Sequence, residues 1–178
     1  MHNEFVVQEI AIRRYRAEDA GALYEAARES VDEVFPWLPW CHPEFSEKEA
    51  REWAASRDTL FDEGSEYHFV IVDGSDRYLG GCGLNQINRI HRLANLGYWV
   101  RTSAAGRGVA TAAVGELARF AFSETDLVRL EIVCGVGNDA SQRVAEKAGA
   151  TREGILRDRL FLHDEPRDAV MYSLTRPK

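Results

Sequence analysis

The sequence lacks a cysteine framework, a long apolar run and a basic segment. Its three cysteines, Cys41, Cys82 and Cys134, are odd in number and widely spaced, so they predict neither a disulfide scaffold nor a pair of metal ligands. The five histidines show no metal-site spacing, and we expect no metal. No apolar stretch approaches the roughly 20 residues that span a bilayer, and residues 1–5 do not resemble a signal peptide. We therefore expect a cytoplasmic location and no membrane partner.

Excess positive charge is also absent. The chain has 22 Lys and Arg against 29 Asp and Glu, a formal net charge of −7, and such a surface repels nucleic acid. It suits a basic or amine-bearing substrate, although the same charge also favours solubility. With 178 residues, 45% of them hydrophobic, and no internal repeat or linker, the chain is expected to form one domain over residues 1–178.

The most informative segment is 96–110, LGYWVRTSAAGRGVA. The pattern predicts a strand, a short turn containing Gly106 and Gly108, and the start of a helix. Backbone N–H groups of such a turn converge on one point, and the helix dipole adds partial positive charge there, so a phosphate or pyrophosphate is the expected ligand. The alternative is an ordinary helix start that uses glycines only for a tight turn.

Two common phosphate loops are excluded at this segment. A Walker A loop needs Gly-Lys followed by Ser or Thr, whereas Arg107 follows Gly106 and Val109 follows Gly108. A dinucleotide fingerprint needs a third glycine where Thr111 stands. The strand before the turn alternates like a one-sided strand of a mixed sheet.

Periodicity along the chain predicts a mixed α/β (α+β) domain. Two prolines exclude a helix from residues 35–40 and make them an aromatic loop. Ser46 and Glu49 predict a capping box, and Asn138 an N-cap. The strands around 67–101 are expected to form an antiparallel meander, and a helical crossover then places 128–134 parallel to the strand before the glycine turn. The expected helices are 17–31, 46–63, 107–124 and 138–149; the other expected strands are 9–15, 67–72, 78–87, 128–134, 151–156 and 169–174.

Four groups of motifs, spread over residues 10–174, resemble the GNAT superfamily of N-acetyltransferases and more narrowly its RimJ/RimL-like branch. The resemblance implies a GNAT fold, with a mixed, mostly antiparallel central sheet that is splayed at the acetyl-CoA site and flanked by four helices. The motifs are WLPW (37–40); GYWV (97–100) with GRGVA (106–110); NDAS (138–141) with KAGA (147–150); and EGILR (153–157) with RDAVMY (167–172).

The resemblance implies acetyl-CoA as co-substrate and a primary amine as acceptor. Backbone amides of residues 105–110 would hold the pyrophosphate, the pantetheine arm would lie between residues 99–101 and 133–135, and an N–H near Val100 would polarise the carbonyl. The Arg107 side chain either adds charge or is simply solvated. The expected acetyl-CoA-binding residues are Trp99, Val100, Arg101, Ala105, Gly106, Arg107, Gly108, Val109, Ala110 and Asn138.

The resemblance also implies that Ser141 assists the departing thiolate; the alternative is that Ser141 only satisfies free N–H groups of the first helical turn. The chain departs from its relatives at Asn95 and Leu160, where they carry glutamates, and at Ala105, where Gln or Arg is usual. The family's general-acid tyrosine is not evident, and Phe161 lies nearby in sequence. A proton acceptor is therefore sought among solvent water and His163, Asp164, Glu165 and Asp158.

Trp37 and Trp40 either line the acceptor site or close the core. Cys41 beside them is either reactive or simply packed, and Cys82 and Cys134 are expected in the core. The resulting hypothesis is an N-acetyltransferase in which the amine attacks the thioester directly. Its acceptor is a protein N-terminal amine, such as that of a ribosomal protein. The alternatives are a small amine (a polyamine, an amino-acid conjugate or an antibiotic) and a non-catalytic acyl-CoA-binding module. A homodimer is expected from the resemblance.

Overall fold

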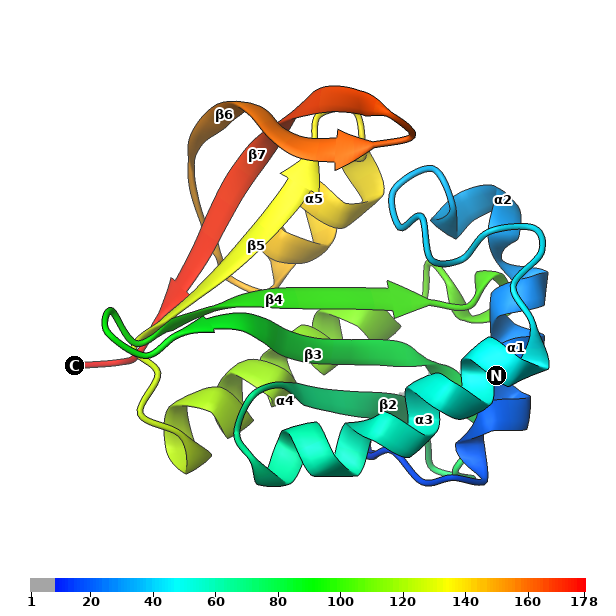
Figure 1. The fold of residues 1–178 in the computed structure, drawn as a ribbon. Helices are drawn as coiled ribbons and strands as arrows, with labels where there is room; N and C mark the ends of the chain where they lie inside the picture. The colour runs from blue at the N-terminus through cyan, green and yellow to red at the C-terminus, as the bar shows by residue number, and fades with distance from the viewer. Residues whose placement is uncertain (1–8) are drawn as a thin grey trace, which may run out of the picture.

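A single seven-stranded sheet organises the chain in a computed structural model, which describes residues 9–178 (Figure 1). The strand order is β1-β2-β3-β4-β5-β7-β6. Neighbouring strands are antiparallel except β4 and β5, which are parallel, as the expected crossover requires. The strands are β1 (Ile10–Arg14), β2 (Tyr67–Asp73), β3 (Tyr78–Asn88), β4 (Leu93–Val100), β5 (Arg129–Gly135), β6 (Thr151–Leu162) and β7 (Glu165–Thr175).

The expectation of four flanking helices is wrong, because the helix predicted over 17–31 is interrupted at Ser30. There the backbone leaves the helical conformation, with φ −112° and ψ 8°. The Ser30 hydroxyl donates to the carbonyl of Ala26 at 2.7 Å, a bond that bends helices. No helix within residues 9–178 is long and apolar enough to cross a membrane. The helices are α1 (Asp19–Glu29), α2 (Val31–Val34), α3 (Glu47–Asp62), the 3-10 turn η1 (Thr102–Ala104), α4 (Val109–Glu124) and α5 (Asp139–Lys147).

The predicted helix caps are confirmed. Ser46 and Glu49 form the reciprocal capping box at the start of α3, and α3 ends just before Gly64, whose φ is +64°. The Asn138 side chain accepts a hydrogen bond from the Ser141 N–H at 3.2 Å and so caps α5. α4 begins two residues later than expected, because Gly108 adopts a left-handed conformation with φ +77°.

The final hairpin is longer than the sequence suggested. β6 extends to Leu162 and β7 begins at Glu165, whereas strands were expected only over 151–156 and 169–174. Most β6 side chains are exposed, since β6 is an edge strand of the sheet. A strand that is exposed over most of its length does not have to alternate apolar and polar residues, so its full length cannot be read from the sequence.

The helices cover both faces of the sheet and create two cores. α1 and α3 lie on one face, and α4 and α5 lie on the other (Figure 1). Leu117 of α4 and Ala145 of α5 are fully buried against one face, as Ala27 of α1 and Ala50 of α3 are against the other. The sheet is therefore a rigid layer with apolar packing on both sides.

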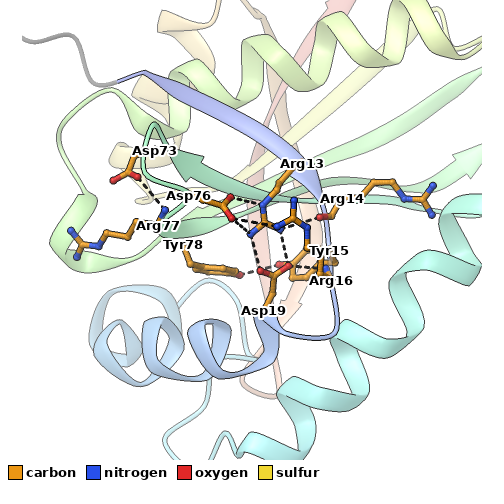
Figure 2. Close-up of polar contacts among 9 residues, drawn as sticks. All are labelled: Arg13, Arg14, Tyr15, Arg16, Asp19, Asp73, Asp76, Arg77 and Tyr78. Carbon is orange, nitrogen blue, oxygen red and sulfur yellow. Dashed lines mark hydrogen bonds and ion pairs between the residues drawn. The ribbon is translucent and has the colours of Figure 1, made fainter.

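A network around Arg13 fastens the start of α1 to the sheet (Figure 2). The Arg13 guanidinium contacts Asp19 of α1 at 2.8 Å and Asp76 of the β2–β3 turn at 2.7 Å. The hydroxyls of Tyr15 and Tyr78 meet beside it at 3.0 Å and are buried. Because Asp19 is itself buried, these bonds set where α1 lies on the sheet.

The parallel pair opens into a V, as expected. β4 and β5 pair only where Leu93–Asn95 face Arg129–Glu131. β4 then continues to Val100 and β5 to Gly135 without further pairing between them. Figure 1 shows the two strands diverging from that point. Along the opening each strand keeps its other neighbour, so the V is held open by β3 on one side and β7 on the other.

Candidate functional site

A cavity of about 500 Å³ lies at the opening between β4 and β5. Its walls come from both strands, from the glycine turn with the start of α4, and from the start of α5. Two residues expected to bind acetyl-CoA, Arg101 and Arg107, do not line it. The expected residues that do line it are Trp99, Val100, Ala105, Gly106, Gly108, Val109, Ala110 and Asn138.

The glycine turn presents uncapped N–H groups to this cavity. Gly106 and Gly108 have φ values of +74° and +77°, a conformation that favours glycine. Gly108 is the N-cap of α4, and no side chain caps the helix. The N–H groups of the first helical turn are thus left without partners inside the helix, and such groups attract anions. A Cβ at either glycine would meet no protein atom within 4 Å, so backbone conformation, not crowding within the chain, requires glycine here.

The N–H of Val100 is directed into the opening. The Arg101 N–H donates to the carbonyl of Leu79 in β3 at 2.8 Å, and Val100 lies opposite Gly80 in the antiparallel register. Successive N–H groups of a strand point to opposite edges. Since the Arg101 group faces β3, the Val100 group faces the side where β5 has moved away, which is where a carbonyl oxygen could accept it.

The Arg101 side chain is used for structure. Its guanidinium pairs with Glu29 of α1 and donates to the Tyr78 carbonyl at 3.2 Å. Glu29 also accepts from the Ser103 N–H at 2.7 Å. The hydrogen bond from Arg101 is the main reason that the pKa of Glu29 falls to about 2. These contacts fix η1, and with it the approach to the glycine turn, while Arg107 is exposed.

Ser141 lies in a small polar cluster on the wall of the first cavity. Its hydroxyl is 2.9 Å from the Tyr98 hydroxyl and 3.2 Å from the Cys134 sulfur. Tyr98 can also donate to the Ser141 carbonyl at 2.9 Å. Burial raises the pKa of Tyr98, which keeps the phenol protonated. The Asn138 side chain caps α5. The Ser141 hydroxyl is therefore not needed as a cap and contacts Tyr98 and Cys134 instead.

Tyr98 is a candidate that the sequence did not reveal. It stands inside the strand motif GYWV, where an aromatic residue is expected for packing, and nothing in the local pattern indicates that its hydroxyl meets Ser141. The contact arises because β4 and the first turn of α5 lie side by side, 43 residues apart in sequence. Only the tertiary structure supplies it.

Asn95 and Leu160 stand where the resemblance implies glutamates, and neither side chain is ionisable. The Asn95 amide donates to the Asn85 side chain at 2.9 Å, and Leu160 lines the first cavity. Phe161 is 70% exposed. His163 contacts the Phe35 carbonyl at 3.1 Å. None of the proton acceptors proposed from the sequence lines either cavity described here; they are His163, Asp164, Glu165 and Asp158.

A second cavity, of about 570 Å³, lies on the face of the sheet covered by α1 and α3. Six aromatic side chains line it, and its acidic and histidine residues are His42, Glu49, Glu52 and His68. The two cavities share part of β4, including Gly97 and Tyr98, so they meet at this strand. The aromatic lining residues are Tyr15, Phe45, Tyr98, Trp40, Trp53 and Trp99.

The two tryptophans of the aromatic loop lie in different cavities. Trp37 lines the first, where its ring packs so closely on Gly135 that an added Cβ would lie 2.8 Å from it. Trp40 lines the second, in edge-to-face contact with Trp99 at 5.1 Å and with Phe45 at 5.4 Å. Neither indole is among the buried core residues. The loop therefore forms walls rather than core.

The cysteines are packed. Cys41 is fully buried, its thiol donates to the Ala27 carbonyl at 3.4 Å, and burial raises its pKa to about 11. Burial also raises the pKa values of Cys82 and Cys134. Thiols held protonated in this way are weak nucleophiles. Among the residues that the structure describes, no group of His, Cys, Asp or Glu is placed to hold a metal ion.

Comparison with known proteins finds a matching family and relatives that cover most of the chain. The model of the family described as the acetyltransferase (GNAT) domain matches residues 9–151. YdaF of Bacillus subtilis, an N-acetyltransferase by name, is 31% identical over 173 residues, covering 96% of this chain and 93% of YdaF. The ribosomal-protein-serine acetyltransferase of Escherichia coli is 30% identical over 138 residues, covering 76% and 75% of the two chains. The solved structure of RimL, a ribosomal L7/L12 alpha-N-protein acetyltransferase in complex with coenzyme A, shares the fold with a TM-score of 0.86 at 24% identity over 94% of each chain.

Proposed function

The chain belongs to the GNAT acetyltransferase family, and on this basis we propose that it moves the acetyl group of acetyl-CoA to a primary amine by direct attack on the thioester. One observation carries the proposal: the two cavities lie on different sides of β4 and meet at Gly97 and Tyr98. A donor and an acceptor bound in separate cavities would then bring their reacting groups together at this strand.

In this proposal acetyl-CoA occupies the first cavity. The uncapped N–H groups at Gly108 and the start of α4 bind its pyrophosphate, and the unpaired edges of β4 and β5 hold the pantetheine arm. The N–H of Val100 stabilises the carbonyl oxygen as it becomes negative during attack. The support is that these groups line one cavity and are directed into it.

In this proposal Ser141 and Tyr98 stabilise or protonate the leaving thiolate. Thiolate departure is easier when a hydroxyl donates to the sulfur or protonates it. The two hydroxyls are hydrogen-bonded to each other, so a proton given to the sulfur by one can be replaced from the other. Burial of Tyr98 keeps that proton in place until it is needed.

The acceptor, in this proposal, is the N-terminal amine of a protein, with its first residues in the second cavity beside Trp40. The support is that relatives covering most of this chain are named as ribosomal-protein or N-acetyltransferases. The −7 net charge also favours a cationic acceptor. A small amine is the second candidate, because a cavity of about 570 Å³ can hold one completely.

An acceptor screen with an intact-mass readout tests the function. Purified protein and acetyl-CoA are incubated with peptides that begin with Ser, Ala or Met, and with spermidine, tyramine and amino-acid amides. A mass gain of one acetyl group on an N-terminal peptide supports the proposal. A gain only on small amines would show that the acceptor is a small amine, the second candidate. Calorimetric binding of acetyl-CoA without acetylation of any amine would identify an acyl-CoA-binding module instead. The single domain over residues 1–178, the homodimer and the cytoplasmic location remain predictions.

A further inference from the structure

His68 lies at the end of a row of residues that leads to β4. In the sheet register His68 of β2 is directly opposite Gly83 of β3, and Gly83 is directly opposite Gly97 of β4. Adjacent strands are about 4.8 Å apart, so two strand spacings separate His68 from the strand where the cavities meet. The one residue between them, Gly83, is a glycine, and so is Gly97 on β4, so no side chain stands between the imidazole and β4 along this row.

The imidazole rests on Gly83. A Cβ added at Gly83 would lie only 2.3 Å from Nδ1 of His68, so this glycine makes room for the ring. The His68 side chain is 13% exposed, and it lines the second cavity together with Gly83 and Gly97. The ring thus forms part of the wall of the cavity proposed for the acceptor. A side chain at position 83 would displace it.

A chain of contacts orients the ring. Nε2 of His68 is 3.0 Å from Oε2 of Glu66, and the same oxygen accepts from Nη1 of Arg57 at 3.0 Å. The Arg57 guanidinium stacks on the Trp53 ring at 3.6 Å, and Trp53 meets the imidazole edge-to-face at 5.0 Å. A carboxylate oxygen is a hydrogen-bond acceptor, so this contact places the N–H of the imidazole on Nε2, where it donates to Glu66. The neutral imidazole then has its lone pair on Nδ1.

The surroundings also favour the neutral ring. Burial lowers the pKa of His68, and the positive charge of Arg57 acts in the same direction, while Glu66 opposes both. The other ionisable side chains of the cavity are Glu49 and Glu52 of α3, His42 of the preceding loop, Tyr15, Tyr98 and Cys82. Of these, His42 has a carboxylate beside each ring nitrogen, with Glu49 3.0 Å from Nε2 and Glu44 3.5 Å from Nδ1. Among them, His68 combines a lone pair with a place on the row to β4.

We propose that Nδ1 of His68 accepts the proton that the acceptor's ammonium group must lose, directly or through one water molecule. The inference rests on the proposed acetyl transfer. The N–H bond of the ammonium breaks as the Nδ1–H bond forms, and the resulting imidazolium is stabilised by Glu66. The neutral amine then attacks the thioester carbon, and the C–S bond breaks with its electron pair on sulfur. The nitrogen loses a second proton as it becomes an amide, and the thiolate gains one, so this second proton ends on the thiol of coenzyme A. His68 finally returns its proton to water.

The neighbouring polar pair on the same face cannot perform this step. Asn85 and Asn95 are adjacent to the glycine row and bond to each other, but a carboxamide has no basic lone pair near neutral pH. An N-terminal ammonium has a pKa of about 8 and a lysine-type ammonium about 10, so deprotonation adds to the barrier near pH 7. A positioned base typically supplies about 100-fold or more in rate.

The variant His68→Gln tests the assignment. Glutamine keeps an amide donor for Glu66 and removes the basic nitrogen. We expect kcat/KM at pH 7, on the best acceptor of the screen, to fall about 100-fold, with loss of the acidic limb of the pH profile and unchanged calorimetric affinity for acetyl-CoA. The matched control is His91→Gln in the exposed β3–β4 turn, which should leave the rate unchanged.

A measurement on the wild-type protein makes the test independent of any variant's folding. Long-range ¹H–¹⁵N correlation spectra report which imidazole nitrogen is protonated. We expect His68 to carry its proton on Nε2 at pH 7. Protonation on Nδ1 would overturn the assignment, and so would a His68→Gln protein with the wild-type rate and pH profile. Neither result would contradict the proposed acetyl transfer. If the wild-type protein acetylates no amine of the panel, the proposed function itself fails, and the role of His68 fails with it.

Discussion

Glu29 and Arg101, 72 residues apart, form the ion pair that joins α1 to the end of β4. Glu29 also accepts from the Ser103 N–H, and the neighbouring Ser30 hydroxyl accepts from the Thr102 N–H at 3.0 Å. The junction of α1 and α2 therefore holds the start of the bend that precedes the glycine turn. A helix on one face of the sheet thus helps to position the glycine turn.

Glu29→Gln should destabilise the protein in a pH-dependent way. Because the folded pKa of Glu29 is about 2 and an unfolded glutamate titrates near 4.3, its stabilisation is present above about pH 4.3 and is lost as pH falls through about 2. Charged hydrogen bonds contribute about 1 to 2 kcal/mol, so at pH 7 thermal unfolding should shift down by several degrees.

The control for this prediction is Glu47→Gln, whose partner Arg51 lies one turn away on the exposed surface of α3. Exposed pairs of this kind contribute little, so its unfolding temperature should barely change. Measured by calorimetry between pH 7 and pH 2, the Glu29→Gln difference should shrink as the wild-type carboxylate protonates. A difference that stays constant over this range would show that charge is not its cause.

Gly108→Val should abolish acetyl-CoA binding. Valine is strained at φ +77°, so the turn must rearrange and its N–H groups lose their common direction. Isothermal calorimetry with acetyl-CoA measures the loss. The matched control is Gly115→Ala inside α4, where a Cβ meets nothing within 4 Å; its affinity should be unchanged and its stability slightly higher. Wild-type affinity in Gly108→Val would contradict the assignment of the turn.

Much of the fold could be predicted because its signals are local. The capping box of Ser46 and Glu49 involves residues three apart, and Pro36 and Pro39 exclude a helix from the aromatic loop without reference to the rest of the chain. The glycine turn is local too, which explains why most of the residues expected around it line the first cavity. The break at Ser30 had no proline or glycine to indicate it, and the exposed edge strand β6 had no alternation.

Apart from Trp40, the wall of the second cavity around His68 could not be predicted, because it is made by cross-strand neighbours. His68 is a lone histidine in an apolar strand, and nothing beside it in sequence indicates more than packing. Its setting depends on Gly83 and Gly97 in the next two strands and on Arg57 from α3. Tyr98 is similar, since its partner Ser141 belongs to another helix. Both residues have ordinary sequence contexts and acquire their neighbours through the sheet register.

Ser141→Ala should lower turnover more than acetyl-CoA affinity. The hydroxyl is placed to act on the sulfur only as the C–S bond breaks, so its loss raises the barrier without weakening ground-state binding. We expect kcat to fall about tenfold or more. Tyr98→Phe should produce a similar fall, and the double variant should cost less than the sum, because the two hydroxyls act as one unit. Turnover equal to wild type in Ser141→Ala would make the cluster purely structural.

Trp40→Ala and Trp37→Ala should separate the two cavities kinetically. Trp40 lines only the second cavity and Trp37 only the first. Removing the Trp40 indole takes away one wall of the second cavity, which we propose for the acceptor, so the acceptor's KM should rise while calorimetric affinity for acetyl-CoA stays unchanged. Removing Trp37 exposes Gly135 on β5 and should weaken acetyl-CoA binding. Equal effects of both variants on both ligands, or a common loss of folding seen by circular dichroism, would mean that the loop closes the core and does not divide donor from acceptor.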